Sequence, residues 1–346
     1  MASSGALRVG RTRRAAVSAL VAAACLSWSI AARAEDEIRI AAAAINVAHS
    51  AVALAAAKPD VFGRHGIKVT VNDLRGASPN CIAALISEAA DLCQVGTTTG
   101  TDAIAEGADL VAVAVLTGPV AEIVLSKQAA DRLSVKADGP IADRVAAMKG
   151  LNIVTSAPGS ANYTILDSLM GTVGSSISDI RYRTLADVPA MIEAIRNQQI
   201  DGAFWVIGSL APVIKDGTGV RWISLARGDV EQYLGLPFTS VFARRGWAEK
   251  NPDLVKRVHD AYADAVAELK NDPQASSELI RKKFFPDLAP DLWNDGYEQG
   301  RLSFLDGARV TAQSWQAFLD LQKKTSGKDY TAAAFDRAVL PTARDQ

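Results

Sequence analysis

The sequence predicts an α/β protein with two similar lobes, each built on a mostly parallel sheet flanked by helices. Strand-like and helix-like segments alternate with short loops, a pattern that favours parallel strands covered on both faces. One stretch also matches a later stretch without a gap: Pro79 falls on Pro189, Asp91 on Asp201 and Gly107 on Gly217, a constant offset of 110 residues. A period of this length is about one small domain.

The matching positions lie where local structure is decided. Each proline suits the first turn of a helix, where a missing N–H costs nothing. Each glycine ends a second helix before another strand. Asp91 and Asp201 each follow a helix and precede a buried strand, so we expect both to fix this turn rather than to touch a ligand.

The elements follow in order from apolar periodicity and from helix start and stop signals. In the first half we expect strands at 37–44, 66–72, 92–95 and 110–116, with helices at 49–58, 79–89 and 98–106. The second half repeats this order with strands at 151–157, 179–185, 202–207 and 220–225, and helices at 158–170, 189–199 and 209–216.

The rest of the chain differs from these halves. A strand begins at 239 and breaks off by 247, and a long amphipathic helix follows Asn251 and Pro252. Further helices begin at Asp272 and span 313–324. A helical tail without strands makes an unlikely independent domain, so we expect it to pack on one lobe.

Composition is that of an ordinary globular chain. Of 346 residues, 49% are apolar and 22% charged, and the net charge is -1. This leaves no electrostatic reason to expect nucleic acid as a partner.

The N-terminus predicts a cleaved signal peptide over residues 1–34. Residues 1–14 are basic without an acidic residue, residues 15–30 are apolar but short for a membrane span, and Ala32-Arg33-Ala34 offers a cleavage site before Glu35. Arg13 and Arg14 leave the twin-arginine route open beside the general one. Cys25 leaves lipid attachment as an alternative. We expect a soluble protein exported to the periplasm.

The remaining cysteines, Cys81 and Cys93, allow two interpretations. In an oxidising compartment the pair forms a disulfide, or both are small buried hydrophobic residues. His49, His65 and His259 are scattered and no CxxC occurs, so we expect no metal site and no cofactor.

The order of several segments resembles the solute-binding proteins of ABC importers. These segments are ISEAADLCQVG, MKGLNIVTSAPGSANYTIL, AIRNQQIDGAFWV and WAEKNPDLVKRVHDAY. Within that class the chain resembles the nitrate/sulfonate/taurine group, which also includes binders of pyrimidine precursors. The likeness covers about residues 37–325.

The resemblance implies a type II periplasmic binding protein fold with two crossover strands, near 117–123 and 236–241. Residues 35–119 and 237–346 would form lobe 1, and residues 120–236 lobe 2, with the tail returning to lobe 1. A sulfonate, carboxylate or pyrimidine-like solute would be clamped between the lobes of a monomer and passed to the permease subunits. An exported or biosynthetic enzyme, or a ligand-sensing domain, is the alternative on this fold. Biosynthetic enzymes on this fold include a pyrimidine synthase with a cysteine-rich motif. That motif is missing from this sequence, and the segment SAPGS does not match the G-x-S-x-G nucleophile elbow.

Site residues follow from the rule that ligands bind beyond the carboxyl ends of parallel strands, near helix N-termini. The candidates are Asn46, Val47, His49, Arg75, Gly76, Thr97, Thr98, Ser156, Gly159, Ser160, Ala161, Trp205 and Thr239. Small residues allow close approach, hydroxyls donate hydrogen bonds, and Trp205 covers an apolar or ring-bearing part.

Simpler structural roles stay open for several of these residues. Ser160 could only cap its helix, Trp205 could belong to the core, Arg75 could be solvated, and His49 could bond at a helix start. The related group often places an aromatic residue one position after the one that Trp205 occupies here, and an acidic residue and a proline follow it. Here Val206, Ile207 and Gly208 occupy these positions, which weakens the case for sulfonate specificity.

Overall fold

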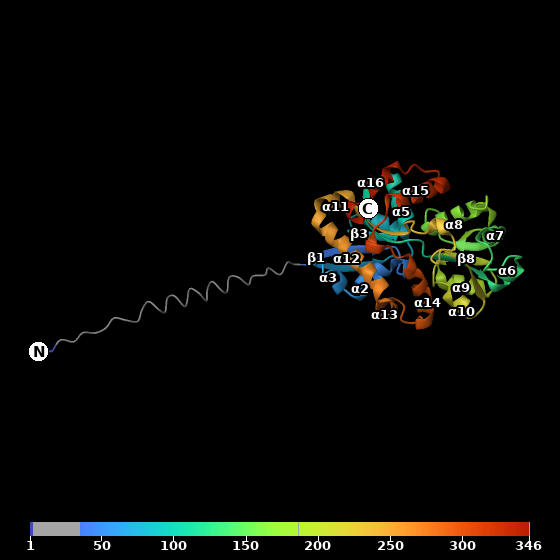
Figure 1. Cartoon of the computed structure of the whole chain (residues 1–346), viewed down its shortest axis with the longest axis horizontal. Helices are drawn as coiled ribbons and strands as arrows, with labels where there is room; N and C mark the ends of the chain where they lie inside the picture. Colours follow the sequence, from blue (N-terminus) through green and yellow to red (C-terminus); the bar gives the residue numbers. More distant parts are fainter. Residues whose placement is uncertain (3–34, 186, 346) are drawn as a thin grey trace. The chain divides into compact units, whose positions relative to one another are not determined.

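The computed structural model describes residues 1–2, 35–185 and 187–345. The chain divides into a segment Met1–Glu35 and a folded unit Asp36–Gln346, and the fold given below is that of the folded unit (Figure 1). The cleavage motif and Cys25 lie outside the described residues, so the signal peptide stays a prediction. Within the described part of the chain, no helix has the length and apolar character needed to cross a membrane.

The first sheet has five strands in the order β2-β1-β3-β10-β4. These are β1 (Asp36–Ala42), β2 (Ile67–Asp73), β3 (Leu92–Gly96), β4 (Leu110–Thr117) and β10 (Thr239–Arg244). Strands β1, β2 and β3 are parallel, whereas β10 is antiparallel to β3 and β4. Between them lie η1 (Val47–His49), α2 (Ser50–Ala57), α3 (Asp60–Gly63), α4 (Ser78–Ile86) and α5 (Thr97–Ala105).

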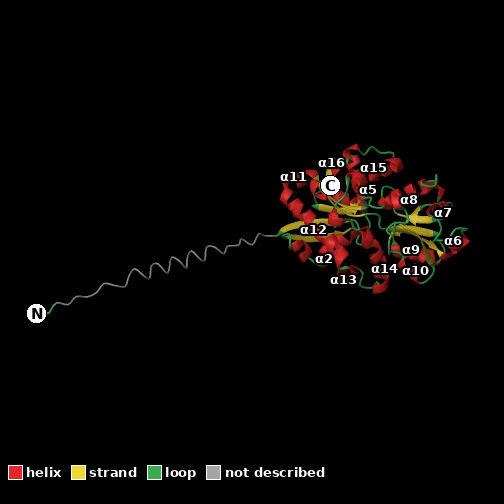
Figure 2. Cartoon of the chain, in the orientation of Figure 1, coloured by secondary structure: helices red, strands yellow, loops and turns green. Residues whose placement is uncertain are grey.

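The second sheet has five strands in the corresponding order, β7-β6-β8-β5-β9. These are β5 (Ala121–Ser126), β6 (Ile153–Thr155), β7 (Arg183–Thr184), β8 (Gly202–Val206) and β9 (Gly219–Ser224). Its helices are α6 (Lys127–Arg132), α7 (Ile141–Ala146), α8 (Ala161–Gly171), η2 (Ile177–Asp179), α9 (Val188–Arg196) and α10 (Ala211–Lys215). Figure 2 shows helices on both sides of the strands, which confirms the predicted α/β class.

The two sheets repeat each other as the sequence predicts. Helix α4 and strand β3 recur 110 residues later as α9 and β8, with the same lengths. Asp91 accepts hydrogen bonds from the backbone N–H of Arg39 at 2.9 Å and from its guanidinium. Asp201 accepts one from the backbone N–H of Asn152 at 2.8 Å. Each aspartate therefore ties its helix-to-strand turn to the neighbouring strand.

The chain passes between the sheets twice. It leaves the first sheet after β4 and enters the second at β5, and it returns between β9 and β10. Both entering strands, β5 and β10, run antiparallel to their neighbours, so each sheet is mostly but not wholly parallel. This sheet membership is compatible with the predicted lobe division, which itself stays a prediction.

Cys81 on α4 and Cys93 on β3 form a disulfide, with their Cα atoms 5.6 Å apart. Both residues are fully buried. Of the two interpretations left open by the sequence, the structure has the bridge, which joins α4 to the central region of the first sheet.

The C-terminal part is helical after β10. Its helices are α11 (Arg245–Lys250), α12 (Pro252–Asn271), α13 (Pro273–Phe284), α14 (Pro290–Gly300), α15 (Ala312–Ser326) and α16 (Phe335–Ala338). Its short 3-10 turns are η4 (Arg301–Ser303), η5 (Asp306–Ala308), η6 (Thr331–Ala333) and η7 (Pro341–Ala343). A further turn, η3 (Glu231–Tyr233), lies before β10. Helix α12 packs on α2 and β4 through an apolar face that includes Val258, Tyr262 and Leu269.

The tail also touches the second sheet's helices, which differs from its expected placement on lobe 1 alone. Helix α14 packs on α10, and α15 packs on α8. The α14 contact depends on two glycines, because a Cβ at Gly208 would lie 2.5 Å from the Cα of Gly296. Arg221 on β9 then joins the buried Glu122 carboxylate of β5 to Asp295 of α14. Periodicity identifies a helix but does not show which partners its faces meet.

Candidate functional site

A cavity of about 230 Å³ lies between the two sheets. Its walls come from the segments that follow β1, β2 and β6, from the ends of β3, β7 and β8, from α5, and from the start of β10. The carboxyl ends of parallel strands gather loops and helix starts at one edge of a sheet, which is where ligands bind in open α/β folds. The cavity therefore lies where the alternating pattern places a binding site.

Most of the predicted site residues come together at this cavity. The predicted residues that line the cavity are Asn46, His49, Gly76, Ser156, Gly159, Ser160, Ala161, Trp205 and Thr239. They belong to both halves of the fold, so a molecule in the cavity would touch both.

Four predicted residues do not line the cavity. Val47 is buried against Gly300 of α14, and Arg75 is exposed to solvent. The Thr97 hydroxyl bonds to that of Ser240 at 2.8 Å, and the Thr98 hydroxyl is buried without a partner among the described residues. Thr97 and Thr98 therefore face the protein interior.

Several wall residues are absent from the list of candidates. They are Ala43, Ala44, Ala48, Ser78, Pro79, Gly96, Thr99, Ala157, Pro158, Asn162, Thr184, Val206 and Phe238. Thr99 was hard to choose because three threonines run consecutively at a helix start, and only the helix phase decides which one faces outward. Phe238 directly precedes β10 and lies in the crossover predicted near 236–241. This position between the two lobes could have identified it as a wall residue.

The cavity wall carries no formal charge at neutral pH. None of its lining residues is Asp, Glu, Lys or Arg, and burial lowers the pKa of His49 to about 4. The starts of α4, α5 and α8 lie at the wall, and the positive end of a helix dipole favours anionic or acceptor atoms. A cationic group would find no carboxylate to offset its desolvation.

Ser160 caps its helix and also belongs to the cavity wall. Its hydroxyl accepts a hydrogen bond from the backbone N–H of Tyr163 at 3.2 Å, which caps α8. The residue also lines the cavity next to Gly159, whose φ of +82° is the left-handed conformation that glycine adopts without strain. The cap holds the helix start against the cavity.

Trp205 contacts the apolar core and also borders the cavity. It is half-buried on β8 opposite Glu122 of β5, packs against the apolar core, and forms part of the cavity wall. A large aromatic face at this place can cover an apolar or ring-bearing group.

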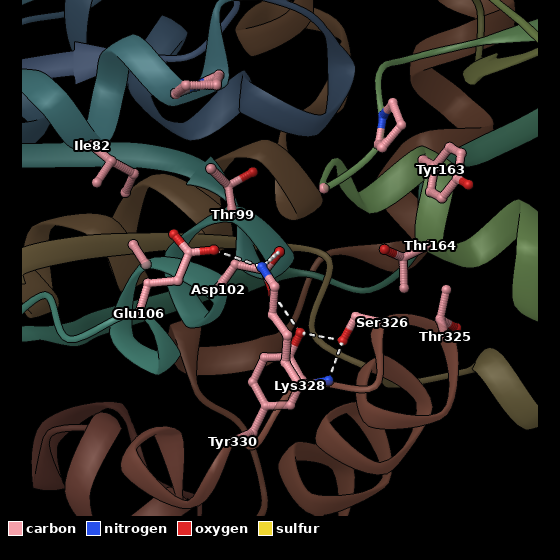
Figure 3. A pocket seen from close by; sticks show the side chains of 14 residues that line it. Ile82, Thr99, Asp102, Glu106, Tyr163, Thr164, Thr325, Ser326, Lys328 and Tyr330 are labelled. Atoms are coloured by element: carbon pink, nitrogen blue, oxygen red, sulfur yellow. Dashed lines mark hydrogen bonds and ion pairs between the residues drawn. The ribbon is translucent and has the colours of Figure 1, made fainter.

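A larger outer groove of about 560 Å³ adjoins the cavity and shares Pro79, Thr99, Pro158 and Gly159 with it. Figure 3 shows its charged side chains directed at one another. Lys328 lies 2.7 Å from Glu106 and 3.3 Å from Asp102. Tyr330 donates to Asp102 at 2.5 Å. Because these groups already satisfy each other, we take the inner cavity as the candidate site and the groove as its mouth.

No cluster of three or more His, Cys, Asp or Glu side chains suited to a metal ion occurs among the described residues.

A sequence model of the NMT1-like family matches residues 33–281. The chain belongs to the NMT1-like family. No curated protein matches its sequence significantly.

Solved structures show the fold of this NMT1-like chain. The alkanesulfonate-binding protein SsuA of Xanthomonas axonopodis pv. citri is 21% identical with a TM-score of 0.69, over 89% of this chain and 98% of that one. The CA3427 gene product of Candida albicans, described as having the generic periplasmic binding protein fold, is 14% identical with a TM-score of 0.64, over 90% and 97%. The nitrate-binding protein NrtA of Synechocystis PCC 6803 is 13% identical with a TM-score of 0.56, over 76% and 68%. The chain has the periplasmic binding protein fold.

Proposed function

We propose that this protein is an extracytoplasmic solute-binding protein, which holds a small organic or anionic solute between its two lobes and delivers it to the permease subunits of an ABC importer. The observation that carries this proposal is the cavity at the strand ends of both sheets, whose wall joins His49 and Thr239 from one half to Ser160 and Trp205 from the other.

The chemistry of the wall narrows the solute. Helix starts and hydroxyls suit a carboxylate, a sulfonate or polar ring atoms, and Trp205 suits an apolar or aromatic part. A volume of about 230 Å³ is somewhat below the usual range for drug-sized ligands, roughly 300–1,000 Å³. It therefore favours a molecule of about one ring. Similarity to an alkanesulfonate-binding and a nitrate-binding protein supports the binding role, while the identity of the solute rests on the cavity.

Native mass spectrometry of protein purified from its own periplasm without denaturation tests the proposal. We expect a bound small molecule that is released unchanged when the protein is unfolded. Return of a chemically altered molecule after incubation would instead favour an enzyme. Failure of every sulfonate, carboxylate and pyrimidine tried to bind would contradict the proposed role for these solute classes.

A further inference from the structure

Two buried polar atoms of residues in the cavity wall have no hydrogen-bond partner among the described residues. They are Nε2 of His49 and Oγ1 of Thr239. His49 is 7% exposed and Thr239 is fully buried. Buried polar groups in folded proteins are nearly always hydrogen-bonded, so each exception calls for a partner that is absent from the protein itself.

A third polar side chain lies on the same part of the first sheet. Both polar atoms of the Gln94 amide are buried without a partner among the described residues. Gln94 of β3 is paired in register with Val241 of β10, two residues from Thr239. Because side chains two apart in a strand share a face, Gln94 and Thr239 lie on one face of this sheet.

The contact on the other side of the His49 ring favours one of the two neutral tautomers. Nδ1 lies 3.0 Å from Oδ1 of Asn46, and a carbonyl oxygen can only accept, so Nδ1 is the donor. In a neutral imidazole the other nitrogen is then a bare acceptor. Burial holds the ring in its neutral form, because it lowers the pKa of His49 to about 4.

We propose that Nε2 of His49 accepts a hydrogen bond from the bound solute, which therefore carries an N–H or O–H donor as well as an acceptor or anionic part. This inference rests on the proposed function and specifies its ligand class. The acceptor part suits the helix starts, and the donor suits His49; Thr239 belongs to the same cavity wall. Nitrate and unsubstituted alkanesulfonates lack such a donor, so we expect them to bind weakly or not at all.

Calorimetric titration with matched pairs of probes tests this inference. The pairs are ethanesulfonate with 2-hydroxyethanesulfonate, benzoate with 4-hydroxybenzoate, and pyrimidine with 4-aminopyrimidine; in each, the second compound adds a donor. In a pair that binds, we expect the donor-bearing member to bind about tenfold more tightly, the upper range for one neutral hydrogen bond. Equal affinity of both members in every binding pair would overturn the inference but leave the proposed function standing.

Variants show whether His49 causes the preference. His49→Leu removes the acceptor and should bring the affinity ratio of a pair close to one, whereas His49→Gln keeps an acceptor oxygen and should restore part of the ratio. If His49→Leu does not fold, Asn46→Ala releases the fixed tautomer and should lower the same ratio. His65→Leu is the matched control, because His65 lies outside the cavity wall and contacts Asp264 at 2.9 Å, so the ratio should stay unchanged.

A measurement without ligand separates the two proposals. Nitrogen NMR of the ligand-free protein should show His49 protonated at Nδ1 and bare at Nε2 near neutral pH. A proton on Nε2 would overturn the inference whatever the probes do. If no pair binds, the proposed function fails for these solute classes and the inference fails with it.

Discussion

At the scale of single residues, Asp201 directly precedes β8 and Trp205 lies near its other end, and we expect the two residues to have different roles. Trp205 is part of the cavity wall near the end of β8, so Trp205→Ala should weaken solute binding by about 1–3 kcal/mol, as expected for a lost aromatic contact. Calorimetric titration measures this loss. Trp247, half-buried on α11 and outside the cavity, is the matched control. Equal binding by Trp205→Ala and Trp247→Ala would place Trp205 in the core only.

Asp201 should affect stability rather than binding. Its carboxylate accepts from the backbone of Asn152 and pairs with Arg132 at 2.6 Å and Arg181 at 3.3 Å. Asp201→Ala leaves the backbone N–H of Asn152, directly before β6, without this partner, so the free energy of unfolding should fall by about 1–3 kcal/mol. Thermal and denaturant unfolding measure this change. The exposed pair of Lys127 and Asp131 supplies the control Asp131→Ala, with an expected change below about 1 kcal/mol. Altered solute affinity of folded Asp201→Ala would contradict a purely structural role.

At the scale of elements, the contact of α14 with the second half of the fold depends on the lack of a side chain at Gly208. Gly208 has φ of +82°, and a Cβ there would meet Gly296 at 2.5 Å. Gly208→Ala should therefore carry both a conformational penalty of about 1–2 kcal/mol and a packing penalty of about 1–3 kcal/mol.

Gly217→Ala is the matched control for this prediction. Gly217 has a similar φ of +76°, but no atom lies within 4 Å of a Cβ built there, so only the conformational penalty applies. Denaturant unfolding of both variants compares the two losses. Equal losses of unfolding free energy in Gly208→Ala and Gly217→Ala would mean that a side chain at Gly208 causes no packing penalty against Gly296.

Elements were the most predictable part of the fold. Proline, aspartate and glycine at fixed spacing placed α4, β3, α9 and β8 to within a few residues, because helix starts and stops depend on local chemistry. The directions in which helix faces and their side chains point were less predictable. The phase of α5 turned Thr97 and Thr98 inward and Thr99 toward the cavity, and the packing of α14 depends on contacts between distant segments.

At the scale of the whole molecule, export remains to be tested directly. The motif Ala32-Arg33-Ala34 predicts a mature chain that begins at Glu35. N-terminal sequencing of protein from the periplasmic fraction reads this end. An intact Met1, or lipid attached to Cys25, would show that the predicted cleavage does not occur.

The proposed function requires that one solute is held between the two lobes. Because the cavity wall is shared between the halves and only two chain crossings join their sheets in the described part of the chain, binding should draw the lobes together by a hinge motion. Small-angle scattering of the protein with and without a saturating solute, with binding established separately by calorimetry, measures this most directly. We predict a smaller radius of gyration in the bound protein. An unchanged radius of gyration at full saturation would contradict a solute clamped between the lobes.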